Sequence, residues 1–478
     1  MKGTVVTRSS RFVHADGTRL VAPDGRPLLL RGMGLGNWLL PEGYMWRFGD
    51  EMSSPRQIEA RIDALVGPER AAEFWRRYRQ AFLTERDVAR IAAHGFDHVR
   101  LPLNSRSLIT EDGHLLEDGF APIDDLLGWC RTHGLLVLLD LHGAPGGQTG
   151  TNIDDSPNGR PELFMDATWR ALTIRLWEGL AHRYRDDPAV LGYDLLNEPL
   201  PNEWQHVYAD ELVSLYRDLT RAIRAIDPDH LIMYEGSHWA TNWDIFDEVW
   251  DDNSALQFHR YWCPPDETSI APYLRARDDL GVPIYMGEGG ENTPEWIYTA
   301  HRLYERHDIG WNFWPWKKLD TRTSPVSARR PEGWDLIADP TQQPDSDTAW
   351  RIMNEFLAAI DIDACSENPE IVNAMLGRGP VTVPAWGHAP SAPEEAGHLA
   401  ALGETTRWHH TAGEPYSPEE ALPIALAAGD ERRYALSAEP RGWHVDADFP
   451  GHIAAHFARG HLTVRATADA ELHRIHVS

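Results

Sequence analysis

The feature that most constrains the fold is a regular alternation between short apolar runs and longer amphipathic stretches. Eight such short runs can be counted before residue 315. This alternation is typical of βα units in a parallel sheet, and eight units favour a closed (β/α)8 barrel over an open doubly wound sheet. The predicted strands cover residues 28–33, 96–101, 135–141, 190–196, 231–235, 255–259, 282–286 and 309–314.

Residues outside these eight runs predict further structural elements. Residues 12–31 carry two Asp-Gly pairs and predict a β-hairpin that leads into the first strand. About sixty residues separate the first two strands, so this insertion is expected to include helices and to build a wall over the active face. Within it, Phe74, Tyr78 and Phe82 recur at helical spacing.

The C-terminal part has a different composition. Residues 377–395 are rich in Gly, Pro and Ala, which indicates a domain boundary, and residues 432–478 alternate with period two, as antiparallel strands do. The expected division is a catalytic barrel with its hairpin over 1–362, a linker over 363–400 and a small β-sandwich-like domain over 401–478.

Composition limits the partners. The net charge of −28 repels phosphate backbones and anionic lipids, so neither nucleic acid nor a membrane is expected as a partner, and no apolar run approaches the roughly 20 residues of a membrane span. The 20 tryptophans favour a carbohydrate substrate, because aromatic faces stack on sugar rings. The first 20 residues have no apolar core of a secretory signal, which predicts a cytoplasmic location. The oligomeric state is not indicated.

Polar residues cluster where the predicted strands end, which is where barrel enzymes carry their catalytic groups. Two are glutamates after buried strands, Glu198 in GYDLLNEP and Glu288 in IYMGEGG. Hydrolysis of a glycosidic bond needs one acid to protonate the leaving oxygen and one carboxylate to act at the anomeric carbon. Other strand-end residues are Arg100, Asp140, His142, Asn197, Glu235, His259, Tyr261 and Trp314.

Several of these neighbours have predicted roles. Asn197 is expected to bond a sugar hydroxyl, Tyr261 to donate to Glu288, and Arg100 to lower the pKa of Glu288. Trp314 is expected to form the floor under the reacting sugar. Trp316 beside it and Trp38 in the long insertion are further candidates for substrate binding, with core packing as the alternative for each tryptophan.

The segments RGMGLGNWL, GFDHVRLPLN, LLVLLDLHG, RYRDDPAVLGYDLLNEP, LIMYEG, QFHRYW, PIYMGEGG and GWNFWPWK resemble glycoside hydrolase family 5, the cellulase-like branch of the retaining barrel glycosidases. The resemblance implies that Glu198 is the acid/base and Glu288 the nucleophile. It also implies a surrounding shell of Arg100, His142, Asn197, His259, Tyr261 and Trp314. The family usually has an aromatic residue after the nucleophile, whereas Gly289 and Gly290 follow here, a departure that concerns the shape of the substrate site.

The sequence also admits other interpretations. Glu235 and Glu291 are rival carboxylates for the nucleophile. A metal-dependent barrel hydrolase is disfavoured because no HxH pair ends the first strand and no HExxH occurs, so neither metal nor cofactor is expected. A non-catalytic carbohydrate-binding barrel is the second rival. The expected activity is retaining, exo-acting, β-glucosidase-like hydrolysis of short oligosaccharides or small glycosides, with an endo-acting β-glucanase or β-mannanase as the alternative.

Overall fold

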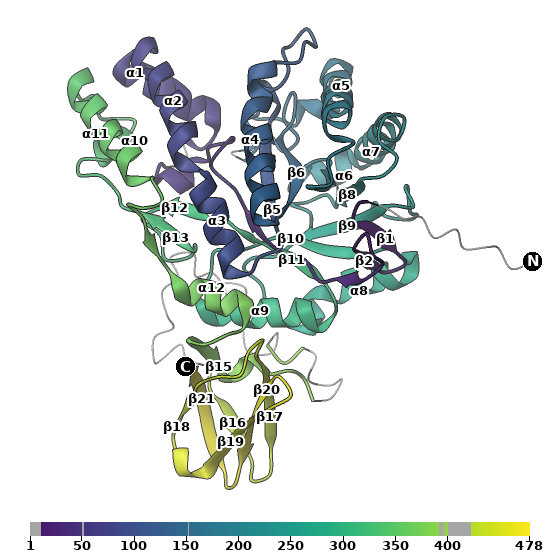
Figure 1. The fold of residues 1–478 in the computed structure, drawn as a ribbon, viewed down its shortest axis with the longest axis vertical. Helices are drawn as coiled ribbons and strands as arrows, with labels where there is room; N and C mark the ends of the chain where they lie inside the picture. Colours follow the sequence, from purple (N-terminus) through teal and green to yellow (C-terminus); the bar gives the residue numbers. More distant parts are fainter. Residues whose placement is uncertain (1–10, 50–51, 152, 392–394, 396, 400–421) are drawn as a thin grey trace, which may run out of the picture.

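The structure is a computed structural model that describes residues 11–49, 52–151, 153–391, 395, 397–399 and 422–478. Eight parallel strands close into a barrel in chain order (Figure 1), which confirms the predicted (β/α)8 fold. These strands are β4 (Arg31–Gly34), β5 (His98–Asn104), β6 (Leu136–Gly143), β7 (Val190–Asp194), β8 (Leu231–Glu235), β9 (Ser254–His259), β10 (Ile284–Gly290) and β11 (Gly310–Trp314).

Helices follow most of the strands along the chain. The segment between β8 and β9, residues 236–253, is instead a loop with turns. The helices of the barrel are α3 (Glu85–His94), α4 (Glu117–His133), α5 (Ala167–Tyr184), α7 (Ala209–Arg224), α8 (Glu267–Leu280), α9 (Pro294–Arg306) and α11 (Ser346–Ala359), with short α6 (Trp204–Val207) and α10 (Asp335–Ala338) between them. In the described part of the chain, none of the helices has the length and apolar character needed to cross a membrane.

The predicted N-terminal hairpin is confirmed. β1 (His14–Asp16) and β2 (Arg19–Val21) pair antiparallel, and β3 (Pro27–Leu28) pairs with β2. Val13 and Leu20 belong to one buried cluster with Leu138, Leu191 and Leu231 of the barrel strands. The hairpin therefore contributes to the apolar core of the barrel.

The long insertion after β4 contains a 3-10 turn, η1 (Gly43–Trp46), and the helices α1 (Pro55–Val66) and α2 (Pro68–Phe82). Trp46 anchors it, because its ring lies 5.0 Å from that of Tyr78 and 4.8 Å from that of Phe356 on α11. Trp334 also donates to the Trp46 carbonyl oxygen over 2.7 Å. The insertion and the last barrel helix therefore form one continuous wall (Figure 1).

The segment predicted to be a linker, 363–400, differs from that expectation. It contains β14 (Ser366–Glu367), α12 (Pro369–Leu376), β15 (Val381–Pro384) and the 3-10 turn η5 (Ala385–Gly387). β14 pairs with β13 (Val326–Ala328), which pairs with β12 (Lys317–Leu319). Gly and Pro in this segment mark turns between short elements, and pairing with neighbouring strands gives these elements their order.

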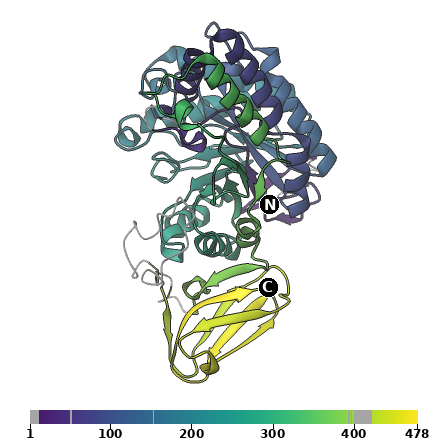
Figure 2. The ribbon, with the colours of Figure 1, turned by 90° about the vertical axis from the view of Figure 1, so that its left-hand side faces the viewer.

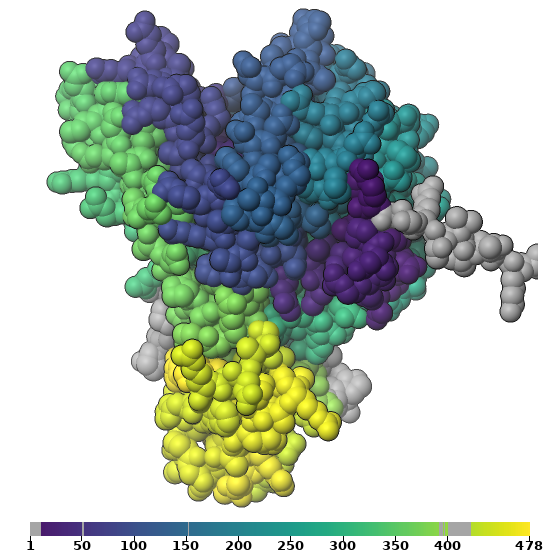
Figure 3. Space-filling view, viewed as in Figure 1, coloured from purple at the N-terminus to yellow at the C-terminus, as the bar shows by residue number. Residues whose placement is uncertain are grey.

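The C-terminal sheets form a lobe below α9 and α12 (Figures 1–3). Antiparallel β15, β21, β16 and β18 form one sheet, and β17, β20 and β19 form the other, so this domain already begins at β15. Residues 401–421 of the predicted domain lie outside the described residues. The strands are β16 (Ile424–Leu426), β17 (Glu431–Ala435), β18 (Trp443–Ala447), β19 (Ile453–Ala458), β20 (His461–Ala466) and β21 (Ala470–Val477).

Candidate active site

A cavity of about 1050 Å³ opens at the carboxyl ends of the barrel strands. Nearly all of its lining comes from strand ends and the loops that follow them, as expected for a barrel of this type. The lining residues are Glu42, Tyr44, Arg47, Phe48, His142, Ile153, Glu198, Trp239, Thr241, His259, Arg260, Tyr261, Trp262, Cys263, Glu288, Glu291, Trp314, Lys318, Leu319, Thr321 and Arg322.

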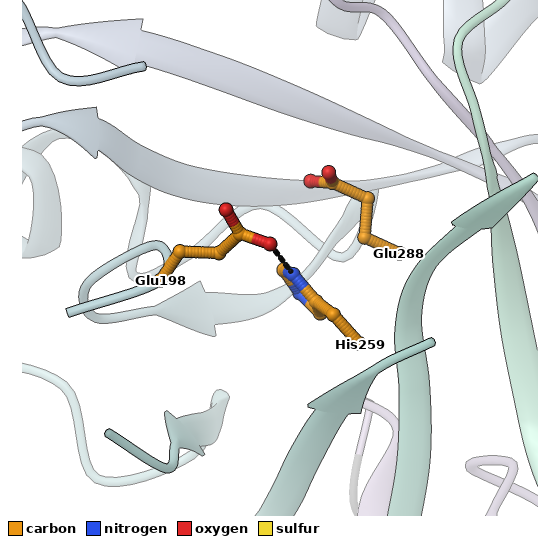
Figure 4. A group of neighbouring side chains, drawn as sticks. All are labelled: Glu198, His259 and Glu288. Carbon is orange, nitrogen blue, oxygen red and sulfur yellow. Dashed lines mark hydrogen bonds and ion pairs between the residues drawn. The ribbon is translucent and has the colours of Figure 1, made fainter. Parts of the chain in front are cut away.

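The two predicted glutamates face each other inside this cavity (Figure 4). Glu198 follows β7 and Glu288 lies within β10. One carboxylate oxygen of each, together with a ring nitrogen of His259, lie within 4.8 Å of one another. The structure thus brings the two carboxyl groups close together from two strands of the barrel that are separated by β8 and β9.

Glu198 is held in a backbone conformation that is rare for its residue type. Its φ is 46°, in the left-handed region, where a residue with a Cβ is strained and where strain gathers at functional sites. Its backbone N–H donates to Glu235 Oε2 over 2.7 Å, and His259 Nδ1 lies 2.7 Å from Glu198 Oε1 (Figure 4). These two bonds fix the direction in which the Glu198 carboxyl points.

Glu288 accepts hydrogen bonds from the Tyr261 hydroxyl, over 2.6 Å, and from Arg100 Nη1, over 2.8 Å. Both predicted contacts are therefore present. Burial raises the pKa of Glu288 above its usual value and the Glu198 charge adds to this increase, whereas the Arg100 charge lowers the pKa, as predicted. Together the charges of His259 and Arg100 oppose the increase without reversing it.

Arg100 is fully buried behind Glu288 and binds several acidic or amide oxygens. It donates to Asp194 over 2.8 Å, to Asn197 Oδ1 over 2.7 Å and to Glu235 over 3.0 Å. Arg100 and Asn197, both predicted to bind substrate, lie under the cavity floor and act through Glu288 and its neighbours. Glu235, the rival carboxylate, is fully buried in this network and supports Glu198.

His259 carries a positive charge at the centre of the site. Burial alone would lower the pKa of its imidazole, but the charges of Glu235 and Glu288 and the hydrogen bond that the ring donates to Glu198 raise the pKa well above its usual value. Its Nδ1 lies 2.7 Å from Glu198 Oε1, and its Nε2 lies 3.3 Å from Glu235 Oε1. His259 therefore bridges two carboxylates as a protonated ring.

Glu198, His259 and Glu288 also form a group that could offer ligands to a metal ion. Two ligand atoms on one tetrahedral zinc, each about 2.1 Å from the ion, lie about 3.4 Å apart. His259 Nδ1 and Glu198 Oε1 are 2.7 Å apart, which is the separation of a hydrogen bond. The geometry and the charge on His259 favour a shared proton over a metal at this position.

His142 and Trp314 form a flat surface in the cavity. Their rings stack with centroids 5.3 Å apart and planes 11° apart. Trp314 Nε1 donates to the Tyr44 hydroxyl over 2.9 Å, and His142 Nδ1 lies 2.8 Å from Asp140 Oδ2. These bonds hold both rings in place, as expected for the floor of a sugar site.

Two predicted substrate-binding tryptophans lie elsewhere, which corrects that prediction. Trp38 is buried, and its Nε1 donates to the Arg79 carbonyl oxygen over 2.9 Å. Trp316 is buried as well, and its Nε1 donates to Asp87 over 3.0 Å. Both apolar rings pack between the barrel and its helices, which is the core-packing alternative.

The cavity includes polar and aromatic residues that had no assigned role: Glu42, Tyr44, Trp239, Trp262 and Lys318. Tyr44 lies in the short turn η1, Lys318 lies in the three-residue strand β12 and the others lie in loops, and such segments have no periodic pattern that reports which way a side chain points. Lys318 forms an ion pair with Glu291, the other rival carboxylate, and its amino group lies 5.5 Å above the Tyr44 ring. The position of Lys318, four residues past the eighth strand, is the one signal that could have found it.

The close approach of neighbouring backbone explains why two glycines follow Glu288. A Cβ on Gly289 would lie 2.6 Å from the Arg260 carbonyl oxygen, and one on Gly290 would lie 2.7 Å from that of Trp314. Gly290 also has a φ of 144°, which side chains rarely tolerate. Close approach to the backbone next to β9 and at the end of β11 thus requires small residues at both positions.

Comparison with known proteins agrees with this geometry. The family model described as Cellulase (glycosyl hydrolase family 5) matches residues 66–320. A beta-xylosidase from Phanerodontia chrysosporium is 32% identical over 348 residues, covering 64% of this chain and 71% of that protein. A probable glucan 1,3-beta-glucosidase A from Emericella nidulans is 31% identical over 237 residues, covering 48% of this chain and 57% of that protein.

The fold likeness extends to the C-terminal lobe. The crystal structure of an endogalactoceramidase superposes with a TM-score of 0.53 at 17% identity, covering 98% of this chain and 100% of that one. At this identity the likeness concerns the fold alone. The family match spans more than half of the 478 residues and includes both facing glutamates. The chain is therefore a glycoside hydrolase and belongs to glycosyl hydrolase family 5.

Proposed function

We propose that this chain hydrolyses β-linked glycosides with retention of configuration, with Glu288 as nucleophile and Glu198 as acid/base. The observation that carries the proposal is the approach of the two carboxylates to within 4.8 Å, oxygen to oxygen. Retaining pairs lie about 5 to 5.5 Å apart, whereas inverting pairs lie about 6.5 to 9.5 Å apart to admit a water molecule. The names of the relatives, beta-xylosidase and glucan 1,3-beta-glucosidase, support a β-linked substrate.

The reaction then has two steps. A Glu288 oxygen bonds to the anomeric carbon while the glycosidic bond breaks, and Glu198 gives its proton to the leaving oxygen. In the second step Glu198 takes a proton from water, the water oxygen bonds to the same carbon, and Glu288 is released. Arg100 and Tyr261 hold Glu288 in position for attack, and His259 orients Glu198.

An exo mode of action is the second part of the proposal. The loop around η1 and the loop after β12 are tied together, because Arg47 donates to the carbonyl oxygens of Leu319, over 3.2 Å, and Asp320. The same two segments also meet where the Lys318 amino group lies over the Tyr44 ring. This wall supports a closed end of the cavity, suited to short oligosaccharides or small, β-glucosidase-like substrates.

The first test addresses the two glutamates. Glu288→Ala should abolish turnover, and added azide should yield a glycosyl azide of inverted configuration, detected by NMR. Glu198→Ala should spare aryl β-glycosides with activated leaving groups far more than those with poor ones, since the former need little protonation. Glu370→Ala, at an exposed site on α12, is the control. Equal losses across leaving groups, or activity that disappears in EDTA and returns with a divalent metal, would contradict the mechanism.

The second test addresses the exo mode. On a soluble β-glucan and on short β-linked oligosaccharides, the enzyme should release single small sugars early while the viscosity of the polymer falls slowly. Chromatography of the products against time measures both. Mixed oligomers with a rapid fall in viscosity would show that the cavity is open at both ends.

A further inference from the structure

Glu42 occupies an unusual position in the cavity. It precedes η1, and its backbone is fixed by an N–H bond to Asn37 Oδ1 of 3.2 Å and by its carbonyl oxygen, which accepts from the Met45 N–H over 3.0 Å. Its side chain is 3% exposed, yet Glu42 lines the cavity. Among the described residues, its Oε1 has no hydrogen-bond partner. A buried polar atom of this kind is costly unless a ligand satisfies it.

The neighbour of this oxygen is His142. His142 Nε2 lies 4.0 Å from Glu42 Oε1, which is too far for a direct hydrogen bond. A hydroxyl oxygen placed about 2.8 Å from each atom would fit between them, since such a triangle closes at 4.0 Å. The terminal torsion of a glutamate is broad, so the Glu42 carboxyl can turn to meet such an oxygen. His142 stacks on Trp314, so this position lies at the edge of the cavity floor.

We propose that Glu42 is a specificity-determining residue that, together with His142, hydrogen-bonds one ring hydroxyl of the sugar held at Glu288. The inference rests on the proposed hydrolysis, because it assigns the sugar ring to the floor beside the nucleophile. It adds a recognition residue from the long insertion after β4.

The pKa shifts of Glu42 and His142 favour a hydrogen-bond donor on one side of the sugar hydroxyl and an acceptor on the other. Burial raises the pKa of Glu42 well above its usual value, and the charges of Glu288, Glu291 and Glu198 raise it further against the opposing charge of Lys318, which favours the protonated form of Glu42. Burial lowers the pKa of His142 to about 3, so its ring is neutral. With Nδ1–H directed at Asp140, Nε2 is an acceptor. The Glu42 acid then donates to the sugar hydroxyl oxygen, and that hydroxyl donates to His142.

One further contact and the charge of Glu42 both affect this arrangement. Asn197 Nδ2 lies 3.4 Å from His142 Nε2, a long bond that competes weakly for the same nitrogen. A neutral Glu42 also adds no charge beside Glu288, which must be ionised to attack. A hydroxyl that is bonded on both sides leaves no room for a further sugar at that oxygen, which agrees with an exo mode.

The experiment compares a nitrophenyl β-glycoside with its four monodeoxy analogues. For the unmodified enzyme, removing the recognised hydroxyl should lower kcat/KM by about ten- to hundredfold. Glu42→Leu, which keeps a similar volume, should lower kcat/KM for the parent glycoside by a similar factor. The same variant should lose little more on that one analogue, because the interaction is already missing, while the other analogues show the same losses in both enzymes.

Two further variants separate recognition from structure. Glu42→Gln keeps a donor and should restore most of the dependence on that hydroxyl. Glu295→Leu replaces another buried glutamate, on α9 outside the cavity, that has one oxygen without a hydrogen-bond partner in the described part of the chain, and it should leave the pattern unchanged. Thermal unfolding checks that all variants are folded, and Glu42→Gln alone carries the test if Glu42→Leu is not.

The inference is overturned if the loss from removing a hydroxyl and the loss from replacing Glu42 are additive. If every deoxy analogue loses the same factor in the unmodified enzyme and in Glu42→Leu, or if Glu42→Gln loses the dependence on one hydroxyl while staying folded, Glu42 does not recognise a ring hydroxyl. Failure of the proposed hydrolysis is a different result. In that case the unmodified enzyme does not release nitrophenol from the parent glycoside with retained configuration.

Discussion

Four carboxyl groups line one cavity, and the partners of three of them give these three different chemistry. Glu288 accepts bonds from Arg100 and Tyr261, Glu198 contacts a protonated His259, and Glu42 has an oxygen without a partner among the described residues. Such differences in environment are how one fold keeps an acid and a base side by side. At the scale of the residue, the hydrogen-bond donors around Glu288 therefore decide whether it can act as a nucleophile.

Tyr261→Phe tests this point. The Tyr261 hydroxyl stabilises the ionised form of Glu288, so its loss should raise the pKa of Glu288 further and move the acidic limb of the kcat/KM profile to higher pH. A bond to a charged group contributes about 1.5 to 3 kcal/mol, which corresponds to a shift of about one to two pH units. Tyr273→Phe, whose hydroxyl donates to the Thr241 carbonyl oxygen, is the control. An unmoved acidic limb would mean that Tyr261 does not support the charge of Glu288.

At the scale of the element, glycines in and after β4 make room for the end of β11. A Cβ on Gly34 or on Gly36 would lie 2.5 Å from the indole of Trp314. The first and eighth strands are neighbours in the closed barrel, so the segment RGMGLG and the segment WNFW meet there. The small residues of one strand thus set the position of the aromatic floor carried by the other.

Gly36→Ala should displace Trp314 and lower kcat/KM by about tenfold or more. Overpacking of this kind costs about 1 to 3 kcal/mol of stability, measured by urea unfolding. Gly49→Ala is the matched control, because a Cβ there meets nothing within 4 Å, and it should change neither quantity. Equal behaviour of the two variants would show that the indole has space to move.

At the scale of the whole molecule, α9 links the barrel to the C-terminal lobe. Every residue from Glu295 to Tyr304 is buried, which is typical of a helix covered on all sides. The Tyr298 hydroxyl donates to the Ala435 carbonyl oxygen over 2.8 Å, and β15 packs against α9 (Figure 2). The lobe therefore covers an apolar face of a barrel helix.

Ending the chain after Ile362 should expose this face of α9. Newly exposed apolar surface promotes aggregation, so the shortened chain should be poorly soluble, or should unfold at a clearly lower temperature than the full chain. Soluble yield and calorimetry measure the effect. A soluble, monomeric barrel with an unchanged unfolding temperature would show that the lobe is a separate domain without a stabilising role.

Local patterns were enough to predict the barrel and the two glutamates. The eight strands follow from apolar runs, and Glu198 and Glu288 follow from their position at strand ends, because a parallel barrel brings all such ends to one face. The N-terminal hairpin likewise follows from its Asp-Gly turns. These features depend on residues that are close together in the chain.

Contacts between distant segments decided the rest. Trp38 and Trp316 are buried in the core while Glu42 and Lys318 line the cavity, and no local pattern distinguishes these positions. Likewise β15 belongs to the C-terminal sheet because it pairs with β21, about ninety residues later. Sequence determined which chemistry is available, whereas long-range packing decided which side chains line the cavity, and burial decided how the pKa values of its carboxyl groups shift.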